Sequence, residues 1–333
     1  MKRIQNRWSI LVIIGLCTSM TFSQTKLAQT GFNFLSLSSD ARSDGMGGAV
    51  NSLSGFSGAM SSNPASMAEM PTFFNASFDI NKWIADINYV SASVIISPSS
   101  GDYGTVGLSV QSVDYGDVEG TMVDRNNPIG GYVETGIINP TALAVGLGYS
   151  KMISKQFGVG ARIKYAYQSL GESTFFDNVS GDVTSKKNKT HAIAYDFGTI
   201  YKTGIKSIAF GMSVTNFSSA VTFESEDFQL PLLFTFGISA NLFDLINSPQ
   251  SRQELLLSVD WTHPRSHPEQ LKIGAEYRFM ELLSLRAGYV SGNDENSFTY
   301  GVGVSSFGLE IDYAYTPFGV FNSVQQFTVR VSL

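Results

Sequence analysis

The stretch Phe157–Tyr167, FGVGARIKYAY, alternates two kinds of side chain with a period of two. Its odd-numbered positions are apolar or aromatic, while the even-numbered positions between them are glycine, alanine or a basic residue. In a β-strand, a period of two places these two kinds on opposite faces. The stretch therefore predicts a strand with one large apolar face and one face that is small or charged.

The same alternation recurs to the end of the chain and predicts fourteen strands. We expect them at residues 73–80, 84–97, 103–113, 140–151, 156–169, 190–202, 207–218, 229–242, 253–262, 269–280, 282–291, 297–306, 307–316 and 324–333. A soluble sandwich has the same period, with its large face packed inward. A glycine-rich small face, and a large face that often ends in Tyr or Trp, favour an antiparallel transmembrane β-barrel instead.

Composition and connection lengths point the same way. The chain holds 32 Gly, 24 Phe and 14 Tyr, only 15% charged residues and a mean hydropathy of +0.04. An even number of strands closes a bacterial barrel with both ends on the periplasmic side. The long connections at 114–139, 170–189 and 219–228 follow odd-numbered strands, so we expect them on the outer side. The connection at 243–252 is long for a periplasmic turn.

The N-terminus predicts export. Lys2, Arg3 and Arg7 precede an apolar run, and small residues precede Gln24, so residues 1–23 read as a secretory signal peptide. Lipid attachment at Cys17 is the alternative, although Leu16 before it is not small. Cleavage after Ser23 removes the only cysteine and three basic residues, so the formal charge moves from −6 to −9. An acidic chain without a basic cluster argues against a nucleic-acid partner.

The small face of the predicted barrel carries charges of both signs, six of each. The basic ones are Arg162, Lys164, Lys272, Arg278, Arg286 and Arg330, and the acidic ones are Asp196, Glu254, Asp260, Glu276, Glu310 and Asp312. Isolated ions are costly in a narrow lumen, so we expect ion pairs that bridge strands across a filled interior. A selective channel more often has one sign at its constriction.

No pattern in the chain predicts an enzyme, a cofactor site or a metal site. His263 and His267 have a spacing that would bind metal on a helix, but a proline follows each of them and disfavours a helix there. The carboxylates at 114–119 lack the fixed ligand spacing of a calcium loop. For the acidic stretch at 292–297, weak calcium binding is the alternative to a solvated hairpin loop. We therefore expect solvated loops at all three places.

The segment before the first strand has a different character. Asn63 is a strong helix N-cap, and Pro64 suits the first helical position, so a short helix is expected there. Gly45, Gly47 and Gly48 indicate close backbone packing. A helix inside a barrel satisfies its own backbone hydrogen bonds while it blocks the bore. The alternative is a linker that caps the periplasmic rim.

Three clusters in this segment, Asp40-Ala41-Arg42, Gly45-Met46-Gly47 and Asn63-Pro64-Ala65, together with the closing YAYTPFG, resemble the PorV/PorQ family of Bacteroidota. That family belongs to the FadL-like group of fourteen-stranded outer-membrane barrels. The resemblance covers the mature chain, with Ser62 where the family often has an aromatic residue. It implies a signal peptide at 1–23, an N-terminal periplasmic or hatch segment at 24–71 and an outer-membrane barrel at 72–333. It also implies a hatch formed by Asp40, Arg42, Gly45, Met46, Gly47, Gly48, Asn63, Pro64 and Ala65.

The resemblance implies two possible functions. PorV-like proteins of the type IX secretion system bind a large outer-membrane translocon and the C-terminal signal domain of exported cargo, whereas FadL-like transporters pass hydrophobic molecules through a gated lumen. A lumen of paired charges and glycine disfavours a long apolar tunnel, so we expect the protein-binding role and a fixed plug. Candidate partner-binding residues on the 114–139 loop are Tyr115, Ile129, Tyr132 and Val133. This loop could equally fold over and seal the barrel.

Overall fold

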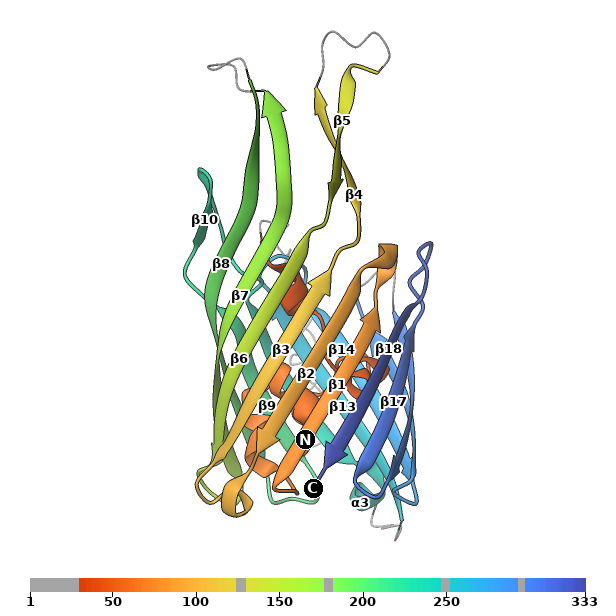
Figure 1. Ribbon diagram of the computed structural model, residues 1–333. Helices are drawn as coiled ribbons and strands as arrows, with labels where there is room; N and C mark the ends of the chain where they lie inside the picture. The colour runs from red at the N-terminus through yellow and green to blue at the C-terminus, as the bar shows by residue number, and fades with distance from the viewer. Residues whose placement is uncertain (1–29, 124–129, 177–181, 247–251, 293–296) are drawn as a thin grey trace, which may run out of the picture.

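The computed structural model describes residues 30–123, 130–176, 182–246, 252–292 and 297–333. Within these residues, fourteen antiparallel strands form one closed barrel, which confirms the predicted fold class (Figure 1). The barrel strands are β1 (Phe74–Lys82), β2 (Asn88–Ile96), β3 (Thr105–Asp114), β6 (Thr141–Met152), β7 (Phe157–Phe176), β8 (Val183–Lys202), β9 (Ala209–Phe217), β12 (Leu233–Asn241), β13 (Gln253–Pro264), β14 (Gln270–Phe279), β15 (Leu283–Val290), β16 (Phe298–Ser306), β17 (Leu309–Thr316) and β18 (Val324–Ser332). Each strand pairs with its neighbours along the chain, and β1 pairs with β18 to close the ring.

The two faces of the wall differ as the period of two requires. Outward side chains such as Leu147, Ile163 and Val302 are 54%, 45% and 46% exposed, while the residues between them are buried toward the lumen. An apolar outer surface of this kind is stable in lipid, where closure of the ring also satisfies every strand edge. Among the described residues, no helix is both long enough and apolar enough to cross a membrane.

The two ends of the barrel are unequal (Figure 1). At the end away from the C-terminus, β7 and β8 continue beyond their neighbours, β4 (Val118–Val123) pairs with β5 (Tyr132–Ile138), and β10 (Val221–Phe223) pairs with β11 (Glu226–Phe228). The sequence predicts plain loops over these three regions, and the structure corrects that prediction. Bacterial barrels carry their long connections outside the cell, so we refer to this end as the outer end.

Residues 30–71, which we call the lumenal segment, lie inside the barrel. The segment starts at the outer end, where Thr30 bridges to Gln229, and leads to β1 at the opposite end. Its helices are η1 (Asn33–Ser36), α2 (Ala41–Gly45), η2 (Ser57–Ser61) and η3 (Pro64–Glu69). Three further short helices, η4 (Ile84–Asp86), η5 (Pro98–Gly101) and α3 (Leu242–Leu245), lie in connections between strands. The expected signal peptide falls outside the described residues.

Candidate functional site

Helix α2 begins at a carboxylate that has two roles. Asp40 is the N-cap, and its Oδ1 accepts hydrogen bonds from the backbone amides of Arg42 and Ser43 at 3.0 and 3.3 Å. Its Oδ2 accepts a hydrogen bond from the guanidinium of Arg330, on β18, at 2.5 Å. The cap that starts the helix therefore also joins the lumenal segment to the barrel wall.

The same side of the wall holds a continuous group of buried ion pairs. Arg42 donates two hydrogen bonds to Glu276, at 2.9 and 2.8 Å. Glu276 also accepts from Arg286 at 2.6 Å, and Arg286 continues to Asp312 at 2.5 Å. We call this group the ionic cluster: Asp40, Arg42, Glu276, Arg286, Glu310, Asp312 and Arg330.

An aromatic ring of the lumenal segment completes the ionic cluster. The guanidinium carbons of Arg42 and Arg330 lie 4.6 and 5.2 Å from the ring centroid of Phe56. Phe56 is itself buried beside Met46 and Val50. Desolvated arginines over an aromatic face gain a cation–π interaction in addition to their ion pairs. Phe56 could not be predicted as part of this cluster, because nothing in the sequence around it indicates two distant arginines.

A second, smaller charge group lies on β7 and β8. Arg162 and Asp196 are directly opposite each other in the strand register, and the Arg162 guanidinium lies 2.6 Å from the carboxylate. Lys164 lies 2.9 Å from the other oxygen of Asp196 and also donates to Asn216. The Asn216 backbone amide donates to Asp196 at 2.7 Å. The carboxylate thus has three donors around it, which offsets its desolvation.

Four of the predicted lumen charges lie outside these two groups of buried ion pairs. Arg278 lies at the edge, 3.2 Å from Glu276 and 3.8 Å from the exposed Glu254. Asp260 accepts a hydrogen bond from the Asn51 amide at 2.9 Å and forms no ion pair with a described residue. Lys272 likewise has no carboxylate within ion-pair distance among the described residues. These two residues depart from the expected pairing.

One carboxylate of the barrel wall that faces the lumen was not among the predicted charges. Asp79, on β1, accepts hydrogen bonds from Gln326 at 2.9 Å and Thr328 at 2.5 Å, both on the neighbouring β18. Its position between Phe78 and Ile80 was a usable signal, because a polar residue between two lipid-facing residues must face the lumen.

Glycines on β7 and β8 let η3 approach the wall closely. A Cβ at Gly160 would lie 2.5 Å from the Ala65 nitrogen, and one at Gly198 would collide with the Asn63 side chain. Asn63 caps η3 through the Ala65 amide at 3.0 Å, and its own amide donates to the carbonyls of Asn51 and Thr199. We call Gly160, Gly198 and the groups they face the glycine contact. Pro64, at the first helical position, belongs to it.

The glycines of the lumenal segment are also at close approaches. A Cβ at Gly45 would lie 3.0 Å from the Cα of Gly301, and one at Gly47 would lie 3.2 Å from the Tyr289 nitrogen. Gly47 and Gly48 have positive φ angles of 64° and 73°, which favour glycine. These positions fit the close packing that the sequence predicts.

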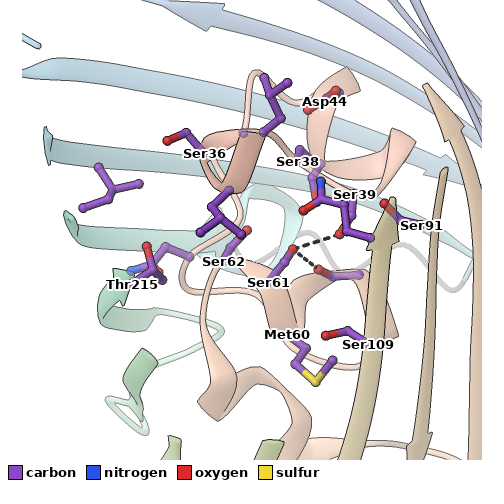
Figure 2. Close-up of a pocket in the computed structure, with 18 of the residues that line it drawn as sticks. Ser36, Ser38, Ser39, Asp44, Met60, Ser61, Ser62, Ser91, Ser109 and Thr215 are labelled. Atoms are coloured by element: carbon purple, nitrogen blue, oxygen red, sulfur yellow. Dashed lines mark hydrogen bonds between the residues drawn. The ribbon is translucent and has the colours of Figure 1, made fainter. Parts of the chain in front are cut away.

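A cavity of about 230 Å³ lies between the lumenal segment and the wall (Figure 2). Serine and threonine hydroxyls form much of its lining, from the lumenal segment as well as from β2, β3 and β9. In Figure 2, Ser91 and Ser109 face the cavity from neighbouring strands, opposite Ser61 and Ser62 of the lumenal segment. Asp44, Arg162, Lys164, Asp260 and Lys272 add charge. This lining suits polar solutes and water.

A second cavity, of about 350 Å³, lies near the outer end and is mainly apolar. Phe32, Tyr115, Leu170, Phe223 and Phe228 line it. Phe32 stacks on Phe228 with ring centroids 5.9 Å apart. The buried residues around Phe32 and Leu230 form an apolar cluster near this end.

The predicted partner-binding residues differ in how exposed their side chains are. Tyr115 packs against the apolar cluster, and burial raises the pKa of its phenol, so it is not an exposed loop residue. Tyr132 and Val133 lie on β5 and are 51% and 42% exposed. Ile129 lies outside the described residues.

The two histidines considered for metal binding lie near one end of β13. His263 stacks on Trp261, and its Nδ1 lies 2.8 Å from Glu269. No group of three or more metal-ligating side chains occurs in the part of the chain that the structure describes.

Comparison with known families gives the context for this geometry. The family model described as type IX secretion system membrane protein PorP/SprF matches residues 131–322, more than half of the chain. The chain belongs to this family. As a member of the PorP/SprF family with a closed fourteen-stranded barrel, the protein is an outer-membrane β-barrel of type IX secretion.

Solved structures show the same fold at low sequence identity. The toluene transporter TodX of Pseudomonas putida is 14% identical, with a TM-score of 0.58 over 93% of this chain and 99% of that one. A TodX monoaromatic hydrocarbon channel with the deltaS2S3 mutation reaches 0.60 at 14% identity, over 88% and 97%. A FadL homologue of Pseudomonas aeruginosa reaches 0.52 at 11% identity, over 88% and 98%. The search of curated proteins finds no match.

Proposed function

We propose that this PorP/SprF-family barrel acts in protein secretion by binding other proteins, the translocon or the C-terminal signal domain of exported cargo, and not by conducting a solute. In this proposal, residues 24–71 form a fixed plug in the barrel 72–333. The partner class comes from the resemblance to PorV/PorQ proteins. The family match supports a role in secretion, and the contents of the lumen support a closed barrel.

The observation that carries the proposal is the attachment of the lumenal segment to opposite parts of the wall. Ion pairs join α2 and its N-cap to β14 and β18, while backbone contacts join η3 to β7 and β8. Breaking one partner of a buried ion pair costs about 3–5 kcal/mol, so removal of the whole segment is strongly disfavoured. Partners then have the outer hairpins and the rims of the barrel as available surfaces.

The hairpin of β4 and β5 is the proposed contact for a protein partner. Val133 and Ile137 are 42% and 66% exposed on β5, and Val118 and Val123 are 48% and 73% exposed on β4. Exposed apolar side chains on a solvated hairpin, beyond the lipid, are typical of a protein-binding surface. The exposed apolar area is small, which suits a transient contact.

The experiment compares secretion with uptake in the native host. Deletion of the protein should remove from the culture medium many proteins that share a C-terminal signal domain, while uptake of long-chain hydrophobic substrates stays normal. Complementation with the double variant Val133→Asp/Ile137→Asp should fail to restore secretion. Val183→Asp, an equivalent exposed change on β8, is the matched control and should restore it. Normal secretion in the deletion strain would overturn the proposal.

A second function, transport of hydrophobic small molecules, has one observation in its favour. The apolar cavity at the outer end, with Phe32, Phe223 and Phe228 in its lining, could admit an apolar ligand. Below it the lining becomes hydroxylated and charged, which disfavours an apolar path through the lumen. Impaired uptake with unchanged secretion in the same deletion strain would favour this function.

A further inference from the structure

The inner end of the barrel, opposite the outer end, presents an exposed apolar side chain at every connection between its strands (Figure 1). These connections join β2 to β3, β6 to β7, β8 to β9, β12 to β13, β14 to β15 and β16 to β17. We call the side chains the apolar turn ring: Tyr103, Ile153, Ile205, Ile246, Met280 and Phe307, each at least 52% exposed. Turns in water are usually built from Gly, Asn, Asp, Ser and Pro, so an apolar residue at every turn of one rim indicates a contact there.

Two members of the ring lie where the backbone itself disfavours them. Phe307 and Gly308 form a two-residue loop between the paired residues Ser306 and Leu309, with φ angles of 50° and 78°. Positive φ at both positions is typical of a type I′ turn, for which Asn-Gly is the preferred pair. Met280 likewise has a φ of 54°. Because a bulky side chain at positive φ is strained, a contact outside the turn must compensate for that cost.

The lengths of the nearby strands indicate what that contact is. β15 and β17 have 8 residues each, and β16 and β18 have 9. A transmembrane strand needs about 9–11 residues. At about 3.3 Å per residue and a tilt of about 40°, eight residues span about 20 Å, whereas the apolar band of a barrel is about 25 Å tall. These strands are therefore short for the bilayer, and Met280 and Phe307 lie at their inner ends.

The composition of the turns and the extent of the ring agree with a lipid contact. Lys155 lies in the same turn as Ile153, and Lys206 directly follows Ile205. An interfacial segment buries its apolar side chains at the boundary of headgroups and acyl chains, while charged neighbours stay in the hydrated headgroup layer. The bilayer also reaches every side of the barrel, whereas a protein interface of ordinary size covers only part of such a rim.

We propose that the apolar turn ring inserts into the headgroup layer of the periplasmic leaflet and completes the apolar span of the short strands β15 to β18. The turns of the inner end then anchor the barrel in the lipid and do not project freely into water. This inference is independent of the role in secretion proposed above, because it concerns only how the barrel is seated in its membrane.

The first test measures the depth of two turns in phospholipid vesicles by spin-label accessibility. Cys17→Ser removes the only native cysteine, and a nitroxide is then attached to Phe307→Cys or Ile205→Cys. Ile163→Cys, on the lipid-facing side of β7, and His267→Cys, on the connection of β13 and β14, are the references for lipid and water. The ratio of oxygen to nickel-chelate collisions at both turns should lie between the two references. A ratio equal to that of the water reference at either turn would overturn the proposal and leave the rim as a surface for a periplasmic protein.

The second test varies the thickness of the bilayer. Phe307→Asn suits the positive φ of the turn and removes only the apolar side chain, so turn strain does not explain a loss. Its folded yield, measured by heat-dependent gel migration, should fall about twofold in dioleoyl vesicles and stay unchanged in thinner dilauroyl vesicles, since mismatch grows with thickness. Val183→Asn, at an exposed valine on the outer extension of β8, is the matched control and should lose nothing in either. A loss for Phe307→Asn that does not increase with thickness, or that the control shares, would refute the proposal.

Discussion

The lumenal segment contacts opposite parts of the barrel wall by two different kinds of interaction. At α2, long charged side chains bridge the gap, and the ionic cluster links the segment to β14, β15, β17 and β18. At η3 there is no gap, because glycines on β7 and β8 let the helix backbone touch the strand backbone. The ionic cluster depends on charges that must all be present, whereas the glycine contact depends on side chains that must be absent.

The difference determines how each contact fails. Removing one charge from the ionic cluster leaves its partners buried and unpaired, so the loss exceeds the value of the pair itself. Adding atoms at the glycine contact displaces a helix that can shift by a small amount, so the loss is limited by how far the segment moves. Four substitutions test this comparison, from the largest expected effect to the smallest.

The largest effect is expected for Arg330→Met. Arg330 is 1% exposed and forms ion pairs with Asp40, Glu310 and Asp312, so its removal leaves three carboxylates without their common partner. We expect the free energy of unfolding to fall by about 3–5 kcal/mol. A denaturant titration of the barrel in lipid vesicles, followed by tryptophan fluorescence, measures it.

Arg278→Met is the matched control for Arg330→Met. Its side chain is 30% exposed, and Glu276 keeps Arg42 and Arg286 when Arg278 is removed. We expect a loss of less than about 1 kcal/mol, as for other exposed ion pairs. Equal losses for the two variants would mean that the ionic cluster is not a connected unit.

The next effect tests the glycine contact. Gly160→Val places a branched side chain where a Cβ alone would lie 2.5 Å from the Ala65 nitrogen. We expect a loss of about 1–3 kcal/mol together with displacement of η3, detected as faster proteolysis between residues 61 and 71. Ala161→Val, on the lipid-facing side of the same strand, is the control and should leave both quantities unchanged. An unaltered proteolysis rate for Gly160→Val would show that the contact does not hold the helix.

A smaller effect is expected for Asn63→Ala. This change removes the cap on the Ala65 amide and the two hydrogen bonds that the side-chain amide donates. We expect a loss of about 1–2 kcal/mol. Asn63→Ser keeps an oxygen that can cap the helix, so its loss should be smaller. If serine and alanine cost the same, the cap contributes nothing and only the donated hydrogen bonds matter.

The sequence predicts the barrel well because the alternation within each strand identifies its lipid-facing and its lumen-facing residues. Alternation assigns Arg162 and Asp196 to the lumen without knowledge of any other strand, and Asn63 with Pro64 marks the start of η3. The hairpin of β4 and β5 was missed because both of its faces meet water, which removes the alternation. The contact of Gly160 with Ala65 was also unpredictable, because it depends on how a non-periodic segment is placed against a distant strand.

The ionic cluster shows the same limit. Cross-strand neighbours such as Glu276 and Arg286 follow from register, but Arg42 with Glu276 and Phe56 with two arginines require the path of the lumenal segment. Asp260 and Lys272 are opposite each other in register yet form no ion pair, and Asp260 accepts a hydrogen bond from the Asn51 amide of the lumenal segment. Six predicted lumen charges of each sign therefore did not determine which of them form ion pairs.

The smallest effect is expected for Lys202→Met, which tests whether every charge that touches the lumenal segment behaves like the ionic cluster. Lys202 lies 2.6 Å from Glu69, at the end of η3, but the two side chains are 44% and 22% exposed. Water and salt screen such a pair, so we expect a loss of less than about 1 kcal/mol that disappears at high ionic strength. The same denaturant titration at low and high salt measures it. A loss as large as that of Arg330→Met would show that burial does not explain the difference between the exposed Lys202–Glu69 pair and the ionic cluster. Charge would then attach η3 to the wall as firmly as it attaches α2.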